Sequence, residues 1–309
     1  MRSPATRRAG FFGGVATLLV AVVLCGCGSD DSGDDDDLGD AGQRDAAVGD
    51  RQVDGQPGRD GQADAPAGDG GTTWWIPPPG MTWQWQLDTP VDQSVSAQVF
   101  DIDLFDNDAS VVATLKATNA KVICYMSAGS WEDWRDDQDQ FPSSVLGNDY
   151  EGWAGEKWLD IRNINVLGPI MEARFDLCRD KGFDGLEPDN IDGYTNDTGF
   201  PLTENDQITY NTWLAVQAHA RGLSIGLKND SDQVTPLLAH FDWALTEDCF
   251  DQGWCSQLQP FVAAGKAVFM AEYTDTGVSF ADACAQAQTF QFSAILKNRD
   301  LDAWRQTCP

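Results

Sequence analysis

The sequence predicts that residues 74–309 form a (β/α)8 barrel of the TIM-barrel type, as one catalytic domain behind a disordered tether. Short apolar runs typical of strands alternate with amphipathic stretches typical of helices, and this strand-then-helix order repeats along the segment. The segment contains all 12 Trp of the chain and is long enough to bury one large core. A doubly wound open sheet is the alternative, but no Gly-x-Gly-x-x-Gly motif follows the first strand candidate.

Eight runs qualify as strands because they are short, apolar and bounded by turn residues. They are Trp83–Leu87, Val99–Leu104, Lys121–Ser127, Gly185–Asn190, Ser224–Lys228, Trp243–Glu247, Ala267–Tyr273 and Phe292–Lys297. The predicted helices between them are Ser110–Thr118, Leu167–Lys181, Glu204–Arg221, Ser256–Ala264 and Phe280–Thr289, with a brief one at Ser231–Leu238. The link between the first two strands is too short for a full helix. Residues 158–162 (WLDIR) form a spare strand-like piece after the third strand.

Residues 1–27 have the features of a bacterial lipoprotein signal peptide. Three Arg residues precede an apolar run, Val15–Leu24, which is too short to span a bilayer. The run closes on LCGC (24–27), which resembles a lipobox. Cys27 is therefore expected to carry a lipid that anchors the exported protein at the cell envelope, at the outer membrane or the cell surface, without a spanning helix. An ordinary secretory signal cut nearby is the alternative.

Residues 28–73 are a low-complexity segment with 13 Asp, no Glu, three Arg and no aromatic residue. Such a composition buries no core, and its like charges extend the chain, so we expect a disordered tether. A calcium-binding repeat is the alternative, but the spacing of the Asp and Gly residues is irregular.

The formal net charge of the chain is −29, of which residues 74–309 carry −22 once the +3 of the signal and the −10 of the tether are set apart. A field of this sign repels polyanions, which argues against nucleic acids and acidic polysaccharides as partners. A neutral or cationic polymer is favoured. We expect the protein to be a monomer.

Six cysteines remain after Cys25 and Cys27, and an even number in an exported chain predicts disulfides. Strand alternation places Cys124 toward the helices if Tyr125 faces the barrel axis, so a bridge to Cys178 in the next helix is reasonable. The expected pairs are Cys124–Cys178, Cys249–Cys255 and Cys284–Cys308, although sequence alone leaves the connectivity open.

A metal site or a cofactor is not expected. No Cys-x-x-Cys motif or Cys/His spacing typical of zinc occurs, and His219 and His240 are the only histidines, which argues against a His-based triad.

Several predicted strands end on polar or acidic residues, and in a barrel the carboxyl ends of the strands carry the active site. These end residues are Asp101 and Asp103 of the second strand, Glu187 and Asp189 of the fourth, Lys228 and Asp230 of the fifth, Glu247 of the sixth, and Glu272 and Tyr273 of the seventh. Residues 182–194 add Asp192 to the fourth group. Acids converging from five strands predict a cleft that cleaves sugars.

Glycoside cleavage needs two carboxyls on opposite sides of the scissile bond. Glu187 and Asp189 are neighbours on one strand, so the partner must come from another strand, and Glu247 faces the fourth strand across the mouth. The loops also carry Trp residues whose flat faces stack on sugar rings; Trp85 and Trp131 are the binding candidates, and Trp134, Trp153 and Trp254 lie in similar places.

Seven segments together resemble glycoside hydrolase family 114. They are QVFDIDLFDND, VICYMSAGSWEDWRDD, WLDIR, GFDGLEPDNIDGYTNDTGFPLT, GLSIGLKND, LTEDCF and GKAVFMAEYTD, in order from about Trp83 to Leu301. The resemblance implies a (β/α)8 barrel and endo-α-1,4-polygalactosaminidase activity, with Asp189 and Glu247 as the catalytic pair.

The substrate implied by this resemblance is a galactosamine polymer, which is cationic where it lacks acetyl groups. Asp101, Asp103, Glu187, Asp192 and Glu272 are then candidates to receive its ammonium groups, and Tyr125, Lys228 and Tyr273 are further substrate-binding candidates. We expect a retaining mechanism in which Asp189 is the nucleophile and Glu247 the acid/base.

Three alternatives stay open. The same barrel can act on another α-linked polysaccharide. The protein can be a non-catalytic surface lipoprotein that binds a matrix exopolysaccharide, although both members of the catalytic pair are present. Finally, the carboxylates of Asp101, Asp103, Glu187 and Asp189 can ligate a divalent metal ion through oxygen.

Overall fold

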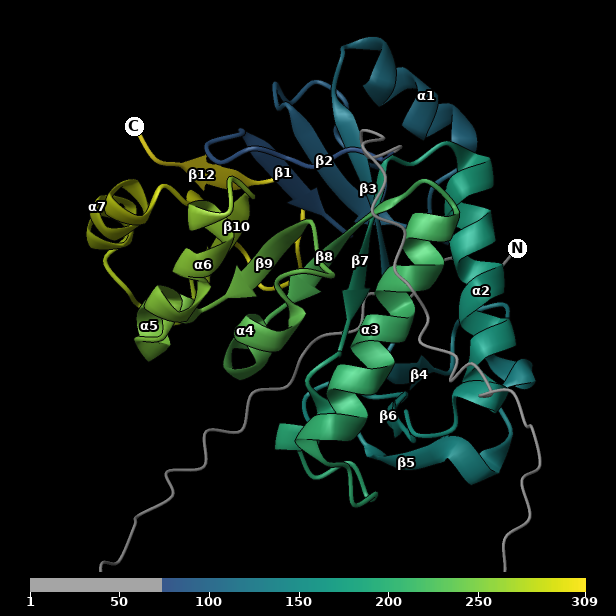
Figure 1. The fold of residues 1–309 in the computed structure, drawn as a ribbon. Coiled ribbons are helices and arrows are strands. Elements are labelled where there is room, and N and C mark those ends of the chain that lie inside the picture. The colour runs from purple at the N-terminus through teal and green to yellow at the C-terminus, as the bar shows by residue number, and fades with distance from the viewer. Residues whose placement is uncertain (1–73) are drawn as a thin grey trace, which may run out of the picture. The chain divides into compact units, whose positions relative to one another are not determined.

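A computed structural model describes residues 74–309. The expected signal peptide, the tether and the lipid site at Cys27 lie outside the described residues. Eight parallel strands form most of one sheet, and each pairs with the next in the order of the chain (Figure 1). They are β1 (Trp83–Gln86), β2 (Val99–Asp103), β3 (Lys121–Ser127), β7 (Gly185–Asp189), β8 (Ser224–Lys228), β9 (Trp243–Glu247), β10 (Val268–Tyr273) and β11 (Ser293–Lys297). All eight predicted strands are confirmed, with ends shifted by one residue at most.

A ninth strand, β12 (Arg305–Thr307), pairs antiparallel with β11 and was not predicted. The seam between β1 and β11 is bridged by other contacts. The Trp83 Nε1 donates a hydrogen bond to the Ser293 carbonyl at 2.8 Å, and the Leu87 N–H donates to the Leu301 carbonyl at 3.0 Å. The chain after β11 therefore joins the two ends of the parallel sheet into a TIM-like barrel.

Apolar side chains form one cluster inside the barrel and another between the strands and the helices, because successive side chains of a strand point to opposite faces. The inner cluster contains Trp83, Trp85, Ile123, Trp243 and Phe269. Cys124 belongs to the outer cluster, between strands and helices, as the alternation predicted. A Cβ on Gly226 would lie 2.4 Å from the Trp243 ring, so the absence of a side chain there makes room for the indole inside the barrel.

The helices follow the strands and cover the outside of the sheet (Figure 1). They are α1 (Ala109–Ala117), α2 (Ile164–Lys181), α3 (Glu204–Ala220), α4 (Val234–Leu237), α5 (Cys249–Gln252), α6 (Gln259–Ala263) and α7 (Phe280–Phe290). No helix separates β1 from β2, as expected. The predicted helix 256–264 is instead a 3₁₀ turn (Cys255–Leu258) followed by α6. Pro260 lies in the first turn of α6, where a backbone N–H would have no partner within the helix, so proline is tolerated there.

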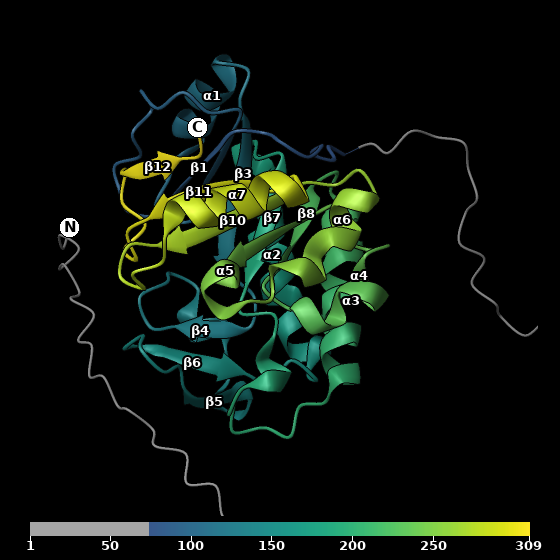
Figure 2. The same cartoon turned by 90° about the vertical axis from the view of Figure 1, so that its left-hand side faces the viewer.

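A second, three-stranded antiparallel sheet is inserted between β3 and α2. Its strands are β4 (Ser130–Glu132), β5 (Leu146–Asp149) and β6 (Glu156–Leu159), in the order β4-β6-β5. The spare strand predicted at 158–162 is β6, which ends sooner because the Asp160 side chain accepts bonds from Arg162 and Asn163 and turns the chain. Both views place this sheet beyond the carboxyl ends of β3 and β7 (Figures 1 and 2).

All three expected disulfides are present: Cys124–Cys178, Cys249–Cys255 and Cys284–Cys308. They tie β3 to α2, close the loop after β9, and hold the C-terminus to α7. Such bonds persist in oxidising compartments, which agrees with an exported protein. Among residues 74–309, no helix has both the length and the apolar character needed to cross a membrane.

Candidate active site

A cavity of about 590 Å³ opens at the carboxyl ends of the barrel strands. Eight of the twelve predicted catalytic and binding residues line it: Trp85, Asp103, Tyr125, Asp189, Asp192, Lys228, Glu247 and Tyr273. The other four, which are Asp101, Trp131, Glu187 and Glu272, do not line it. The strand ends therefore converge as expected, but individual acids lie at different depths.

Three neighbouring strands end in the same way. Asp189, Lys228 and Glu247 are the last residues of β7, β8 and β9, and each is followed by a residue in the left-handed region: Asn190 (φ 62°), Asn229 (φ 55°) and Asp248 (φ 53°). Asn and Asp adopt this conformation more readily than other residues with a side chain. The sharp turn stops each strand directly after its functional side chain.

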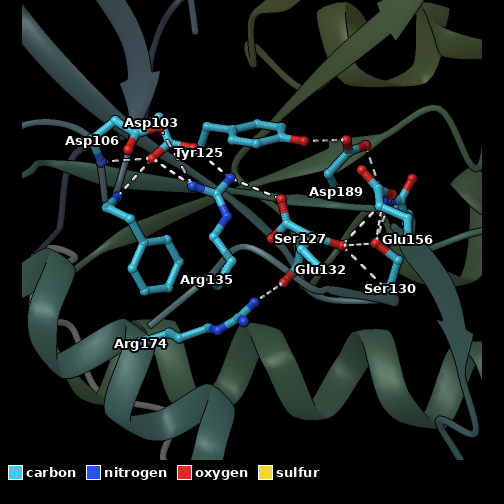
Figure 3. A network of polar contacts seen from close by, with 12 residues as sticks. Asp103, Asp106, Tyr125, Ser127, Ser130, Glu132, Arg135, Glu156, Arg174 and Asp189 are labelled. Carbon is cyan, nitrogen blue, oxygen red and sulfur yellow. Dashed lines mark hydrogen bonds and ion pairs between the residues drawn. The ribbon is translucent and has the colours of Figure 1, made fainter. Parts of the chain in front are cut away.

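The Asp189 carboxylate is held by three donors. Its Oδ1 accepts from the Lys228 ammonium at 2.9 Å and from the Asn190 N–H at 2.9 Å, and its Oδ2 accepts from the Tyr125 hydroxyl at 2.8 Å. Figure 3 shows the Tyr125 hydroxyl directed at this carboxylate. The side chain is still 18 % exposed, so Asp189 is fixed in place and reachable from the cavity.

The backbone carbonyl of Asp189 is fixed by the two residues that follow β3. The N–H groups of Ala128 and Gly129 donate to the Asp189 carbonyl at 2.9 and 3.1 Å. A Cβ on Gly129 would lie 1.6 Å from the Asn190 carbonyl oxygen, so only glycine permits this approach.

Glu247 stands across from Asp189 and shares a donor with it. Its Oε2 accepts from the Asn229 amide at 3.1 Å and lies 3.2 Å from the Lys228 ammonium, while its Oε1 accepts from the Tyr273 hydroxyl. The side chain is 25 % exposed. Because both carboxylates contact one nitrogen, the nearest oxygens of Asp189 and Glu247 are separated by about 6 Å at most.

Lys228 is the centre of this arrangement. Its ammonium contacts Glu187 at 2.9 Å in addition to Asp189 and Glu247, and lies 4.7 Å from the centre of the Trp85 ring. Burial by itself lowers the pKa of a lysine, but the three carboxylates outweigh it and hold the pKa of Lys228 well above its ordinary value. Lys228 is therefore a permanent cation between the two sides of the site.

Asp101 and Glu187 form a buried pair beneath Lys228, and both are 0 % exposed. Burial, and then the charge of Glu187, raise the pKa of Asp101 well above its usual range; burial raises the pKa of Glu187 to about 7 although Lys228 opposes it. Neither Asp101 oxygen nor Glu187 Oε2 meets another donor. The pair lies beneath Lys228, which contacts Glu187 at 2.9 Å, and forms the floor of the site.

The Asp103 carboxylate accepts four hydrogen bonds from other residues of the chain. It accepts two bonds from the Arg135 guanidinium, at 3.0 and 2.7 Å, and two from the N–H groups of Phe105 and Asp106, at 2.7 and 2.9 Å. Arg135 also contacts Glu132 at 2.8 Å and is nearly buried. Asp103 therefore holds Arg135 in the cavity wall (Figure 3), and the guanidinium offsets its charge.

Glu132 and Glu156, which sequence reasoning missed, bring further acid into the cavity wall from the inserted sheet. They face each other across β4 and β6. Burial raises the pKa of Glu156 to about 8, and the charges of Glu132 and Asp189 add to this effect. Its Oε2 accepts from the Ser130 hydroxyl at 3.1 Å, and the Asn190 amide contacts Ser127 and Ser130, each at 3.0 Å. The alternation of side chains along Ser130–Glu132 was the sequence signal that could have pointed to Glu132.

Two further predicted residues, Glu272 and Trp131, form hydrogen bonds with backbone groups of loops. Glu272 is buried and accepts from the N–H groups of Phe250 and Asp251, at 2.8 and 3.3 Å, so it holds the loop after Glu247. Trp131 donates to the Gln138 carbonyl at 3.1 Å. The aromatic faces in the cavity lining belong to Trp85, Tyr125, Trp134, Tyr150, Trp153, Trp254 and Tyr273.

The oxygen-ligated metal considered for the acids of β2 and β7 does not fit this geometry. Arg135 neutralises Asp103, and the Lys228 ammonium lies between Glu187 and Asp189, where a cation would bind. Within residues 74–309, a separate group of possible ligands is Cys249, Cys255 and Glu272, but both thiols are consumed in a disulfide.

Comparisons with known proteins agree with this geometry. No curated protein matches the chain. A crystal structure of Aspergillus fumigatus Ega3 in complex with galactosamine is 43 % identical, with a TM-score of 0.73 over 78 % of this chain and all of that one. The glycoside hydrolase domain of PelA from Pseudomonas aeruginosa is 13 % identical, with a TM-score of 0.58 over 75 % of this chain and 99 % of the other, and shares the fold.

The family profile of glycoside-hydrolase family GH114 matches residues 64–309, which is most of the chain and includes every strand of the barrel. Two facing carboxylates in an aromatic-walled cavity at the strand ends are what a glycosidase requires. The chain therefore belongs to glycoside-hydrolase family GH114.

Proposed function

We propose that this enzyme cleaves internal α-1,4 linkages of a galactosamine-containing polysaccharide, with retention of anomeric configuration. The observation that carries the proposal is the pair Asp189 and Glu247, both held by Lys228 and both open to the cavity. The galactosamine complex of the 43 % identical Ega3 supports the choice of sugar.

The retaining mechanism is taken from the placement of the two carboxylates on either side of Lys228. Their nearest oxygens are at most about 6 Å apart, which is compatible with the roughly 5–5.5 Å between the carboxyl groups of a retaining pair. Asp189 would attack the anomeric carbon as the glycosidic bond breaks, while Glu247 passes its proton to the leaving oxygen. Water would then release the sugar from Asp189, giving its proton to Glu247.

Tyr125 and Asn190 hold Asp189 with two uncharged donors, and Lys228 adds a charged one. These bonds hold the Asp189 carboxylate in a fixed orientation, while Tyr273 and Asn229 orient Glu247 on the other side. A rigid frame of this kind reduces the entropy lost on reaching the transition state.

The charge of the domain supports a cationic substrate. Residues 74–309 carry −22, and the cavity wall contains Asp192, Glu132 and Glu156 besides the catalytic pair. Such a field attracts the ammonium of each unacetylated sugar, and salt weakens this attraction by screening it.

The test is product analysis on acetylated and deacetylated galactosamine oligomers with the isolated domain (74–309), at about 0.1 M and 1 M salt. We expect shorter oligomers of the deacetylated substrate, a first product in the α configuration, and slower cleavage at high salt. A β-configured first product would overturn the retaining mechanism, and a preference for acetylated chains at every salt concentration would overturn the choice of substrate.

We also propose that Cys27 carries the lipid that anchors the enzyme at the cell envelope, on the strength of the LCGC motif. Cys27→Ser should shift the protein from the membrane fraction to the soluble one. Continued membrane association at unchanged mass would contradict this assignment.

A further inference from the structure

Arg299 lines the cavity in the loop after β11, close to Glu247 along the barrel rim. The ends of β11 and β10 pair through Lys297 and Tyr273. β10 pairs in turn with β9, where Ala271 is opposite Glu247. Three neighbouring strands therefore bring Arg299 and Tyr273 to the side of the cavity that carries Glu247.

The Arg299 guanidinium lies over the Tyr273 ring. Its Cζ is 3.9 Å from the ring centre, and the Tyr273 hydroxyl donates a hydrogen bond to Glu247 Oε1. Burial, and then the charge of Glu247, raise the pKa of Tyr273 well above its usual range, so the hydroxyl keeps its proton and remains a donor. A cation, a ring and a carboxylate thus follow one another in direct contact.

Two carboxylates fix the orientation of the guanidinium. Asp275 accepts from Nε at 3.0 Å and from Nη2 at 2.9 Å, and Asp248 accepts from Nη1 at 2.7 Å. A planar fork of donors sets the direction of an arginine side chain, which the single ammonium of a lysine cannot do. Arg299 is therefore anchored to the loops after β9 and β10, and the Tyr273 ring cannot move toward it.

The charge of Arg299 argues against a role in binding a cationic polymer. A guanidinium repels an ammonium, whereas the rest of the cavity wall is rich in acids. The two carboxylates that offset the charge of Arg299 belong to the chain itself, in Asp248 and Asp275. Its contact with Tyr273, by contrast, leads directly to one of the two facing carboxylates.

We propose that Arg299 is a positioning residue, which orients the acid/base Glu247 through the Tyr273 ring. This inference rests on the proposed function and adds a residue to it. Glu247 has to direct its proton at the leaving oxygen, and a displacement of about 1 Å can lower a rate by about 100-fold. The contact of the guanidinium with the ring limits this displacement.

The experiment compares Arg299→Lys with Arg162→Lys on two substrates. Arg162 is the matched control, because it makes the same two-point contact with Asp160, is equally exposed (36 % against 35 %) and lies outside the cavity lining. One substrate is a deacetylated galactosamine oligomer, whose leaving sugar needs a proton. The other is the 2,4-dinitrophenyl α-glycoside of such an oligomer, whose leaving group departs without one.

We expect Arg299→Lys to lower kcat/KM about 10-fold on the oligomer and to leave it within about two-fold of wild type on the dinitrophenyl glycoside. Arg162→Lys should match wild type on both. An equal loss on the two substrates, or no loss on either, overturns the positioning role. Should Arg299→Lys fail to fold, Asp275→Asn removes the fork from its other side and should give the same difference between substrates.

Tyr273→Phe tests whether the ring carries the effect. It removes the hydroxyl bonded to Glu247 and keeps the ring beneath Arg299. The same difference between substrates is expected. Adding Arg299→Lys should then cost no more than about two-fold further, because both changes interrupt one series of contacts. Losses that multiply in the double variant would show that Arg299 does not act through Tyr273.

The wild-type enzyme separates this inference from the proposed function. If it cleaves neither substrate, the proposed function fails. If it cleaves both and Arg299→Lys shows no difference between them, the proposed function stands and the positioning role alone is overturned.

Discussion

The floor and the mouth of the barrel use the same residue types for different purposes. Glu187 and Asp189 are two residues apart on β7 and point to the same side of the strand. Glu187 is 0 % exposed and pairs with Asp101, whereas Asp189 is 18 % exposed and faces Glu247 across the cavity. Lys228 contacts both levels. Two residues along the strand, each advancing about 3.3 Å, thus separate a fully buried carboxyl group from one that is open to the cavity.

The comparison shows that the depth of a carboxyl group in the barrel, rather than its residue type, decides whether it is open to the cavity. At the floor, desolvation raises the pKa values of Asp101 and Glu187, and Glu187 contacts Lys228 from below. At the mouth, the carboxylates have fixed donors on one side and open space on the other. Variants at the two levels should therefore have different signatures.

The largest effect is expected at the mouth. Asp189→Asn and Glu247→Gln should each lower kcat by about 10³-fold or more, because each removes a group that forms or breaks a covalent bond or moves a proton. Both changes preserve shape, so the melting temperature should stay near that of wild type. A folded variant with near-normal kcat would remove that residue from the catalytic pair.

Lys228→Met tests the link between the two levels. It leaves Glu187, Asp189 and Glu247 without their common cation, and breaking a buried ion pair in this way costs about 3–5 kcal/mol of unfolding free energy. Urea denaturation measures the loss. Lys157→Met, at an exposed pair with Asp149, is the matched control and should change stability by about 1 kcal/mol at most. Equal losses in the two variants would mean that Lys228 is not the structural centre.

A smaller effect is expected at the floor. Glu187→Gln changes the charge below Lys228 but touches no part of the cavity lining, so kcat should fall by about 10-fold while KM stays within a factor of two. A rise in KM at constant kcat would show instead that Glu187 binds the sugar directly, as the sequence analysis expected.

The smallest effect concerns pH and the cavity wall. The pKa of Glu156 is raised from 4.5 to about 8, so the folded state retains a proton that the unfolded chain has lost. Its contribution to stability is fully present below about pH 4.5 and is lost as the pH rises toward 8. Glu156→Gln mimics the protonated form, and should therefore match wild type at pH 5 and exceed it by about 1 kcal/mol or more at pH 8 in denaturant titrations. Parallel pH profiles of the two proteins would contradict the raised pKa.

What the sequence by itself determined is the set of features that depend on local geometry. The strand-helix alternation, the rows of inward side chains and the outward position of Cys124 follow from the period of a strand and the order of elements, which neighbouring residues dictate. The convergence of Asp189, Lys228 and Glu247 also follows, since parallel strands bring their carboxyl ends to one rim.

Only the tertiary structure decided which acids are free. Asp103 is paired with Arg135, which lies 32 residues away on the chain, and Glu187 is paired with Lys228, 41 residues away. Glu156 enters the wall because an inserted sheet folds over the strand ends. Solvation and charge pairing are set by groups that are distant along the chain and close in space, and they alone distinguish a reactive carboxylate from a buried one.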